Sequence, residues 1–397
     1  MDITIYPGKL SGTMQIIPSK SQAHRLLICA AFADTETQII CPETNADISA
    51  TADCLNALGA KITRTDIGYL VIPARGIPKK ALLDCKESGS TLRFMLPIAG
   101  ALGVETTFQM AGRLPQRPLS PLKEEMERMG CRISLPTHNT LLCKGRLMPG
   151  AYSIDGGVSS QFISGLLFAL ALLDSDCTLE ITGKVESLPY IQMTRAALQC
   201  FGAKINDNHI SPSLPLTSPG KITVEGDWSN GAFFLAANAL GSNICINGLQ
   251  DNSPQGDRIC KDILSSNDTM HLSAADIPDL VPVLSVVAAA KKGGTFTDIA
   301  RLRLKESDRV ASTIAMLAAF GIYAEADNNT LKVYPGSFTG GTVHSENDHR
   351  IAMSAAIAAT IANNPVTLLG AECVSKSYPR FWEVYKALGG NYEQHIR

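Results

Sequence analysis

Two carboxylates in the C-terminal half of the sequence stand among cationic residues and could move protons. Asp279 lies in ADIPDL, directly before an apolar run, and Glu306 lies in RLRLKESDR, next to Lys305. A pair of carboxylates can act as general acid and general base. Neighbouring cations favour the ionised form of such a group, whereas burial opposes it. Each residue also has a purely structural interpretation, a helix cap for Asp279 and a salt bridge for Glu306.

Basic side chains lie beside apolar segments in both halves of the sequence, where an unpaired charge is costly. A multiply charged anionic ligand would satisfy several of them together, because arginine pairs with oxyanions through parallel hydrogen bonds. Taken singly, each could instead be a solvated surface residue. These residues are Lys20, Arg25, Arg93 and Arg117 in the first half and Arg303, Lys305, Arg309, Arg350 and Lys376 in the second.

Serine and threonine residues stand where several apolar segments begin. In IIPSKSQAHRLL, Ser19 is placed to cap a helix, and Gln22 three residues later completes a capping box. The segments ESGSTLR and VSSQF begin in a similar way. Helix N-termini carry free N–H groups and a positive dipole end, so several starts on one face would form an anion site. The positive charges of Lys20 and Arg25 would add to the positive potential of the helix start and would together attract an anionic ligand.

Six segments that are apolar on nearly every side recur at similar intervals. With Arg25, Arg93, Gln161, Gly231, Val281 and Arg350 as markers, the intervals are 68, 68, 70, 50 and 69 residues. A helix that is apolar all round must be buried, and even spacing indicates a repeat architecture. The six predicted buried helices are residues 24–33, 90–102, 161–173, 231–240, 279–290 and 349–362.

A second, amphipathic type of helix falls between the buried ones and ends in glycine. Glycine supplies the left-handed residue after the last turn, and the alternating pattern that follows it predicts a strand. We therefore expect an α/β fold of six βαβαββ repeats, in which the fourth lacks its hairpin because its interval is short. The terminating glycines are Gly59, Gly130, Gly202, Gly321 and Gly389.

Six repeats of this size are best packed as two lobes of three. The segment VEGDWSN, near Asp227, is similar to the entry at IIPSKS, so we expect the chain to cross between lobes at these two places. The prediction is a discontinuous lobe of residues 1–18 and 228–397 and a second lobe of residues 19–227. Ligand sites favour clefts between lobes, so the active site is expected there.

Composition and charge exclude several classes of protein. A net charge of −2 argues against a nucleic-acid protein. The eleven cysteines contain no CxxC pair, which is typical of a reducing cytoplasm. The start MDITIYPGKL has no signal-peptide pattern, and the apolar runs are too short to span a membrane. His24, His344 and His349 lack metal-ligand spacing, so no metal is expected.

The order of motifs along the whole chain resembles that of the enolpyruvyl transferases, and specifically the 3-phosphoshikimate 1-carboxyvinyltransferases, or EPSP synthases. The combination of LKESDR, NDHR and SSQF is specific, although each motif alone is not. The other matching segments are PSKSQAHR, ESGSTLR, LPQRPL, DGGVSSQF, ESLPYIQMT, IPD and CVSKSYPRF.

The resemblance implies two inside-out, barrel-like α/β lobes of three βαβαββ repeats each, which close over the site. It implies transfer of the enolpyruvyl group of phosphoenolpyruvate to the 5-hydroxyl of shikimate-3-phosphate, with release of phosphate. The reaction passes through a tetrahedral intermediate by addition and elimination, without metal or cofactor. It belongs to the shikimate pathway of aromatic amino acid biosynthesis, in the cytoplasm, and a monomer is the family expectation.

The resemblance also implies roles for individual residues. Asp279 matches the base that accepts the 5-hydroxyl proton, and Glu306 matches the group that handles the methylene proton. Lys20 and Lys376 join them as catalytic residues. The residues expected to hold shikimate-3-phosphate are Lys20, Ser21, Arg25, Ser159, Ser160, Gln161, Ser187, Asp279 and Lys305. Those expected to hold phosphoenolpyruvate are Lys20, Gly89, Arg117, Gln161, Arg309, Arg350 and Lys376.

Three features depart from the family pattern. Glu87 and Arg301 stand where many members have asparagine, which puts a shikimate-3-phosphate contact at Arg301 in doubt. The missing fourth hairpin lies away from the motifs, so it is expected to lower the stability of its lobe rather than alter the chemistry.

Gly89, in contrast, follows the family pattern. It matches the position where a side chain would crowd glyphosate, a competitor of phosphoenolpyruvate, so sensitivity to glyphosate is expected.

Two other functions compete with this interpretation. The UDP-N-acetylglucosamine enolpyruvyl transferases share the fold and the donor, but they resemble GAKN near the first strand and carry a loop cysteine. Here Ser21 follows the lysine, and GVETTFQMAGRLPQRPL contains no cysteine.

The second alternative is a non-catalytic scaffold that binds anions. Asp279 and Glu306 count against it, because a pure anion binder gains nothing from carboxylates beside its ligand.

Overall fold

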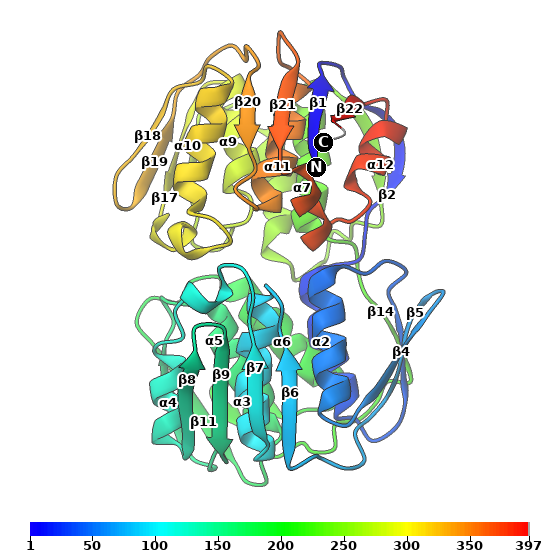
Figure 1. Cartoon of the computed structure of the whole chain (residues 1–397), viewed down its shortest axis with the longest axis vertical. Coiled ribbons are helices and arrows are strands. Elements are labelled where there is room, and N and C mark those ends of the chain that lie inside the picture. Colours follow the sequence, from blue (N-terminus) through cyan, green and yellow to red (C-terminus); the bar gives the residue numbers. More distant parts are fainter. Residues whose placement is uncertain (396–397) are drawn as a thin grey trace. The chain divides into compact units, whose positions relative to one another are not determined.

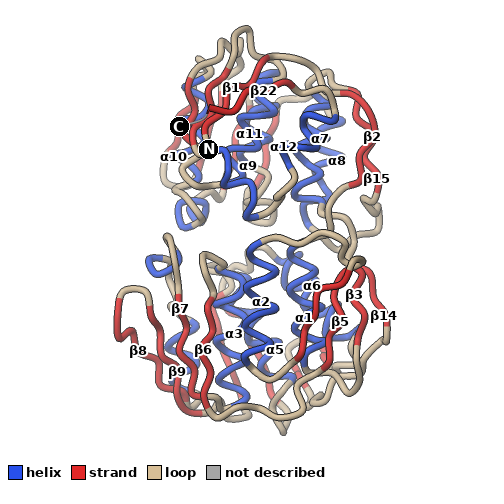
Figure 2. Tube along the Cα trace, turned by 45° about the vertical axis from the view of Figure 1, so that its right-hand side comes forward, coloured by secondary structure: helices blue, strands red, loops and turns tan. Residues whose placement is uncertain are grey.

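The computed structural model describes residues 1–395 and divides into two compact units. The terminal unit consists of Met1–Ile17 and Gly226–Arg397, and the central unit is Pro18–Glu225. Each unit encloses its own cluster of buried apolar side chains. The fold is mixed α/β, and Figures 1 and 2 show helices and strands alternating along the chain in each unit.

The central unit, whose residues are all described, contains three four-stranded sheets. Their strand orders are β14-β3-β5-β4, β6-β7-β9-β8 and β10-β11-β13-β12. In each, the first pair is parallel and the other pairs are antiparallel. The strands are β3 (Thr37–Ile40), β4 (Lys61–Thr65), β5 (Gly68–Ile72), β6 (Lys80–Asp84), β7 (Glu105–Gln109), β8 (Cys131–Thr137), β9 (Thr140–Gly145), β10 (Ala151–Asp155), β11 (Cys177–Thr182), β12 (Ile205–Asn206), β13 (His209–Ile210) and β14 (Lys221–Thr223).

Helices of the central unit alternate with these strands along the chain. A short 3-10 helix, η1 (Leu114–Gln116), precedes α4. The α-helices are α1 (Lys20–Ala31), α2 (Ala46–Ala57), α3 (Gly89–Leu102), α4 (Leu122–Arg128), α5 (Ser160–Ala171) and α6 (Leu188–Cys200).

The described part of the terminal unit has two four-stranded sheets and one two-stranded sheet. The four-stranded orders are β16-β17-β19-β18 and β20-β21-β1-β22, and β15 pairs in parallel with β2. Among the described residues no strand lies between β15 and β16, where a hairpin would complete a third such sheet. The strands are β1 (Asp2–Tyr6), β2 (Ser11–Gln15), β15 (Asn243–Asn247), β16 (Met270–Ser273), β17 (Gly294–Thr297), β18 (Ala324–Ala326), β19 (Thr330–Val333), β20 (Thr342–His344), β21 (Val366–Leu369) and β22 (Asn391–His395).

Helices of the terminal unit include three short 3-10 segments that carry or flank charged residues. These are η2 (Gly256–Ile259), η3 (Ala300–Leu304) and η4 (Ala371–Lys376). The α-helices are α7 (Trp228–Ala239), α8 (Cys260–Ser265), α9 (Val281–Ala290), α10 (Arg309–Ala319), α11 (His349–Ala359) and α12 (Phe381–Ala387).

The six apolar segments are helices α1, α3, α5, α7, α9 and α11, and nearly all of their residues are buried. In α11 every residue is buried. A helix surrounded by other elements has no polar face, so its sequence shows no helical periodicity and only its length separates it from a buried strand. The prediction of six buried helices is confirmed.

Five amphipathic helices end two residues before the predicted glycine, namely α2, α4, α6, α10 and α12, whereas α8 is followed by Ser266. The residue after the last turn takes a positive φ, for example 106° at Gly59 and 111° at Gly130. A strand then follows, such as β4 after α2 and β8 after α4. Left-handed backbone is costly for residues with a Cβ, so glycine at this position favours a sharp turn from helix to strand.

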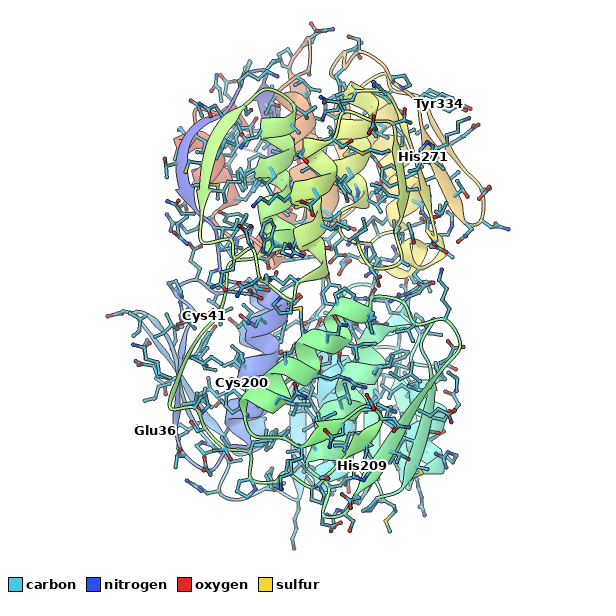
Figure 3. All side chains as sticks on the ribbon, turned by 180° about the vertical axis from the view of Figure 1, so that it is seen from behind. Glu36, Cys41, Cys200, His209, His271 and Tyr334 are labelled. Carbon is cyan, nitrogen blue, oxygen red and sulfur yellow. The ribbon has the colours of Figure 1, made fainter. Side chains whose placement is uncertain are left out.

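The described residues contain eleven free cysteines, of which Cys200 and Cys245 are exposed. Figure 3 shows Cys200 on α6, together with outward-facing side chains such as His209 and Tyr334. No helix among residues 1–395 is both long and apolar enough to cross a bilayer.

Candidate active site

The start of α1 pairs its first cation with a carboxylate from α2. Lys20 Nζ lies 2.9 Å from Asp47 Oδ2, and both side chains are mostly buried. Ser19 caps the helix by accepting a hydrogen bond from the Gln22 N–H. The Gln22 side chain, however, accepts from the Glu225 N–H at 2.7 Å, and the Ser19 N–H donates to the Glu225 carbonyl. The predicted capping box is therefore wrong in its second half, because Gln22 ties α1 to the end of the central unit.

Arg25 is buried in the second turn of α1 and contacts neutral groups. Its Nε donates to Thr194 Oγ1 at 2.8 Å, Nη1 to the Ser21 carbonyl at 2.6 Å, and Nη2 to the Tyr190 carbonyl at 2.9 Å. Its guanidinium also lies over the Phe94 ring. Burial lowers the pKa of Arg25 to about 10, so the group remains a cation at neutral pH. Within the described residues no carboxylate is bonded to it, so its charge is available to an anion.

The start of α3 is shaped by a close contact between Gly89 and Arg117. A Cβ added at Gly89 would lie 2.5 Å from Arg117 Nη1 and 3.0 Å from its Cζ. Arg117 Nε is buried and has no hydrogen-bond partner among the described residues. The absence of a side chain at Gly89 therefore lets a guanidinium stand directly at a helix N-terminus, where an anion is favoured.

The start of α5 is connected to α3 through Gln161. Ser159 caps α5 by accepting from the Gln161 N–H. Gln161 Oε1 accepts from Arg93 Nη1 at 2.7 Å, and its Nε2 donates to Ser90 Oγ at 2.9 Å. Arg93, which the residue roles implied by resemblance omit, thus orients the amide of Gln161.

Two further predicted residues of the central unit are serines at helix starts. Ser160 is the buried first residue of α5. Ser187 precedes α6 with a φ of 56°, left-handed backbone that is unusual for a residue with a Cβ, and it is buried. Strained backbone at a helix start marks a functional candidate when it is found where other site residues gather.

In the terminal unit, Asp279 is bonded to cations and does not cap a helix. Arg309 Nη1 lies 2.7 Å from its Oδ1, Arg350 Nη2 lies 3.3 Å from its Oδ2, and Lys305 Nζ lies 3.7 Å from Oδ1. The N-cap of α9 is Leu280, with no side-chain cap. Burial acts to raise the pKa of Asp279. The positive charges of Lys305, Arg350 and Arg309 outweigh burial and hold this pKa well below its ordinary value.

Arg309 is the buried centre of this cluster, with its side chain 1% exposed. It donates through Nε to Asp348 at 3.0 Å and through Nη2 to Glu306 at 2.6 Å, in addition to Asp279. Burial acts to lower the pKa of Arg309, but these three carboxylates raise it above its ordinary value. The predicted salt bridge of Glu306 is confirmed, and it coexists with any catalytic role because Glu306 is 29% exposed.

Asp348 was not singled out by the sequence, although it belongs to NDHR. It is fully buried and caps α11 by accepting from the Arg350 N–H at 2.9 Å. Because one carboxylate caps the helix and bonds Arg309, it fixes α10 and α11 together. The only signal in the sequence was an aspartate directly before a buried helix.

Lys305 and Lys376 are the other two cations of the terminal unit that are expected to bind substrate. Burial lowers the pKa of Lys305 to about 8. The charges of Arg309 and Arg301 lower this pKa further, whereas the charge of Asp279 raises it. Lys376 Nζ donates to the Asn347 carbonyl at 2.9 Å. Lys376 is thereby held at the start of α11.

The predicted residues thus gather as two clusters, one in each unit. Both combine cations with helix N-termini, which suits anionic ligands, and the terminal-unit cluster also holds three carboxylates on the guanidinium of Arg309. Within residues 1–395, no group of three or more His, Cys, Asp or Glu side chains is arranged to hold a metal ion.

Comparisons with known proteins identify the family of the chain. A family model described as EPSP synthase (3-phosphoshikimate 1-carboxyvinyltransferase) matches residues 5–385. A 3-phosphoshikimate 1-carboxyvinyltransferase of Clostridium beijerinckii is 38% identical over 429 residues, covering 99% of this chain and 98% of the relative. One from Clostridium perfringens is 39% identical, covering 98% of each. The first aligned length exceeds the 397 residues of the chain, so that relative carries residues that this chain lacks.

Solved structures share the fold. An EPSP synthase from Acinetobacter baumannii superposes with a TM-score of 0.76, covers 99% of this chain and 100% of its own, and is 22% identical. The family match spans nearly the whole chain and the relatives align over almost their full length. The chain therefore belongs to the EPSP synthase (3-phosphoshikimate 1-carboxyvinyltransferase) family.

Proposed function

We propose that the chain transfers the enolpyruvyl group of phosphoenolpyruvate to the 5-hydroxyl of shikimate-3-phosphate, with release of phosphate. Family membership over nearly the whole chain supports this reaction, EC 2.5.1.19, which makes the protein a transferase of the shikimate pathway. The observation that carries the proposal is the bonding of Asp279 and Glu306 to the buried Arg309. Two carboxylates for proton transfer thereby share one anion-binding cation.

In the terminal unit, Asp279 is proposed to accept the 5-hydroxyl proton and Glu306 to handle the methylene proton. Arg309, Arg350 and Lys376 are proposed to bind phosphoenolpyruvate. The cations around Asp279 make it a weak base before substrate arrives, since they stabilise its ionised form. An anion bound to Arg309 and Arg350 would offset their charge, and the basicity of Asp279 would rise when the donor is in place.

In the central unit, cations and helix starts are proposed to bind both substrates. Gly89 and Arg117 hold phosphoenolpyruvate, and Lys20 and Gln161 contact both ligands. Arg25, whose bonded partners are neutral, and the start of α5 provide positive potential that suits a phosphate ester. The residues proposed to hold shikimate-3-phosphate are Lys20, Ser21, Arg25, Ser159, Ser160, Gln161, Ser187, Asp279 and Lys305.

We further propose that the two units are the family's inside-out lobes and act together on one pair of substrates. The boundaries expected are residues 1–18 with 228–397, and residues 19–227. Support comes from the repeated sheet pattern within each unit. Because contacts to shikimate-3-phosphate are assigned to both units, this ligand should compact the protein. Small-angle scattering profiles that are identical with and without it would contradict this arrangement.

We propose in addition that the protein is cytoplasmic, that it is a monomer, and that it needs no metal or cofactor. The eleven free cysteines of the described residues suit a reducing compartment. Sedimentation at working concentration tests the monomer.

The experiment that tests the function mixes the protein with both substrates and measures phosphate release. Phosphate release that requires both substrates is expected. No release while both ligands still bind would overturn the enzyme and favour an anion-binding scaffold. Turnover with UDP-N-acetylglucosamine in place of shikimate-3-phosphate would instead favour the other enolpyruvyl transferase reaction.

A further inference from the structure

A third carboxylate, Asp257, is buried next to the terminal-unit cluster and has no part in the proposed reaction. It lies in η2 and is 2% exposed. Gln255 fixes this segment against the start of α7, because its Oε1 accepts from the Trp228 N–H at 3.1 Å and its Nε2 donates to the Gly226 carbonyl at 2.8 Å. The segment that carries Asp257 is therefore tied to the start of α7.

The contacts of Asp257 connect it to Arg350 through one residue. Ser229 Oγ donates to Asp257 Oδ2, and the main-chain oxygen of Ser229 accepts from Arg350 Nη1 at 3.0 Å. Arg350 Nη2 in turn bonds Asp279. Asp257 thus acts on Arg350 in two ways, by fixing Ser229 and by its own charge.

The other carboxylate oxygen of Asp257 is unsatisfied. Oδ1 is buried and has no hydrogen-bond partner among residues 1–395. An ionised carboxylate in this position leaves one buried oxygen without a donor from residues 1–395, which is costly. A protonated carboxyl avoids most of that cost, because a neutral group needs less solvation.

The charged groups around Asp257 come from each helix that packs near it. Asp227 stands at the start of α7, Asp279 precedes α9, Arg350 is in α11, and the Cys260 thiol begins α8. Burial and the charges of Asp279 and Asp227 raise the pKa of Asp257 to about 7, while Ser229 and Arg350 act to lower it. The thiol is not a competing charge, because burial raises the pKa of Cys260 above its ordinary value.

We propose that Asp257 is a positioning residue for Arg350 that takes up a proton when phosphoenolpyruvate binds, so that donor binding is coupled to protonation at this site. The proposal rests on the proposed function, in which Arg350 binds that donor. An anion that pairs with Arg350 offsets the positive charge that favours ionised Asp257, and its own charge opposes ionisation further. The proton comes from solvent, and no bond between heavy atoms changes.

The test compares the KM for phosphoenolpyruvate of the wild type and Asp257→Asn between about pH 6 and pH 9. Asparagine keeps an oxygen for Ser229 and cannot ionise. The ratio of the two KM values cancels the ionisation of the substrate and of every shared group. We expect a ratio of wild type to variant near one at low pH, rising to about tenfold one pH unit above the midpoint. The value of kcat should change less than KM.

The matched control is Asp262→Asn, which removes an exposed carboxylate five residues away on α8. Its KM ratio to wild type should not depend on pH. A ratio for Asp257→Asn that is equally flat would overturn the proposal, as would a uniform loss of kcat at every pH, because either indicates a structural role alone.

A second variant covers the case in which Asp257→Asn fails to fold. Ser229→Ala removes the hydroxyl that stabilises ionised Asp257 but keeps the main-chain oxygen that receives Arg350. The midpoint in the KM profile should move to higher pH, and an unmoved midpoint would contradict the coupling.

Infrared difference spectra of substrate-free wild type and Asp257→Asn should show a protonated carboxyl below the midpoint only. That readout needs no turnover, so it separates failure here from failure of the proposed function.

Discussion

Arg309 Nη1 lies 2.7 Å from Asp279 Oδ1, and the same guanidinium bonds Glu306 through Nη2 at 2.6 Å. The two carboxylates proposed to move protons therefore share one buried cation. A change in the charge of either alters the field at Arg309 and, through it, at the other. The two proton transfers are for this reason expected to be coupled.

Replacing Asp279 by alanine should abolish phosphate release while shikimate-3-phosphate binding stays within roughly tenfold, because the proposed base is lost but the proposed central-unit contacts remain. Turnover and calorimetric binding measure the two effects. Asp268→Ala, at an exposed residue bonded locally to Ser266, is the control. A wild-type rate in Asp279→Ala would show that its role is wrongly assigned.

Glu306→Gln should likewise abolish turnover with little effect on folding, because glutamine still offers Arg309 an oxygen but cannot exchange the proton. The rate of phosphate release measures the loss of turnover, and thermal unfolding measures the effect on folding. The matched control is Glu383→Gln, which alters an exposed pair of the same sequence spacing, with Arg380 Nε 2.9 Å away. Equal loss of activity in both variants would argue against a specific role for Glu306.

Arg309→Met should cost about 3–5 kcal/mol of unfolding free energy, since it leaves the fully buried Asp348 without its cation. Arg303→Met should cost less than about 1 kcal/mol, because the pair of Arg303 with Asp308 is exposed and 3.6 Å long. Denaturant unfolding checks both values. Similar losses in the two variants would contradict the central place of Arg309.

Gly89→Ala should raise the KM for phosphoenolpyruvate and lower sensitivity to glyphosate, while the KM for shikimate-3-phosphate changes little. The new Cβ would stand 2.5 Å from Arg117 Nη1, so the guanidinium must move. Stability should not fall, because alanine favours helix more than glycine does. Gly76→Ala is the control, since a Cβ there meets no atom within 4 Å. Unchanged kinetics in Gly89→Ala would separate Arg117 from the donor site.

Asp257→Asn should become more stable relative to wild type as pH rises from about 5 to 9. The pKa of Asp257 is raised from 3.8 to about 7 in the folded chain, so folding binds a proton. The resulting stabilisation is full below the unfolded pKa and is lost as pH rises through the folded one. The shift corresponds to at most about 4 kcal/mol. Unfolding free energies at both pH values check this, and a constant difference would refute it.

Local features of the site were predictable from the sequence, whereas its long-range partners were not. Ser19 caps α1 as expected, because a cap involves residues three apart. Gln22 instead bonds the main chain of Glu225, 203 residues away. Lys20, a cation at the wrong end of a helix dipole, is explained by Asp47, which belongs to the next helix.

The sequence by itself determined the six buried helices, the glycines that end the amphipathic ones and the residue types able to bind anions. Periodicity, composition and backbone conformation act over a few residues, so they are legible in one dimension. Only the tertiary structure decided that Asp279 pairs with Arg309 and Arg350 rather than capping α9, and that Asp348 and Asp257 are buried beside them. Electrostatic partnership depends on distance in space and on exclusion of water, and both arise only when distant segments pack together.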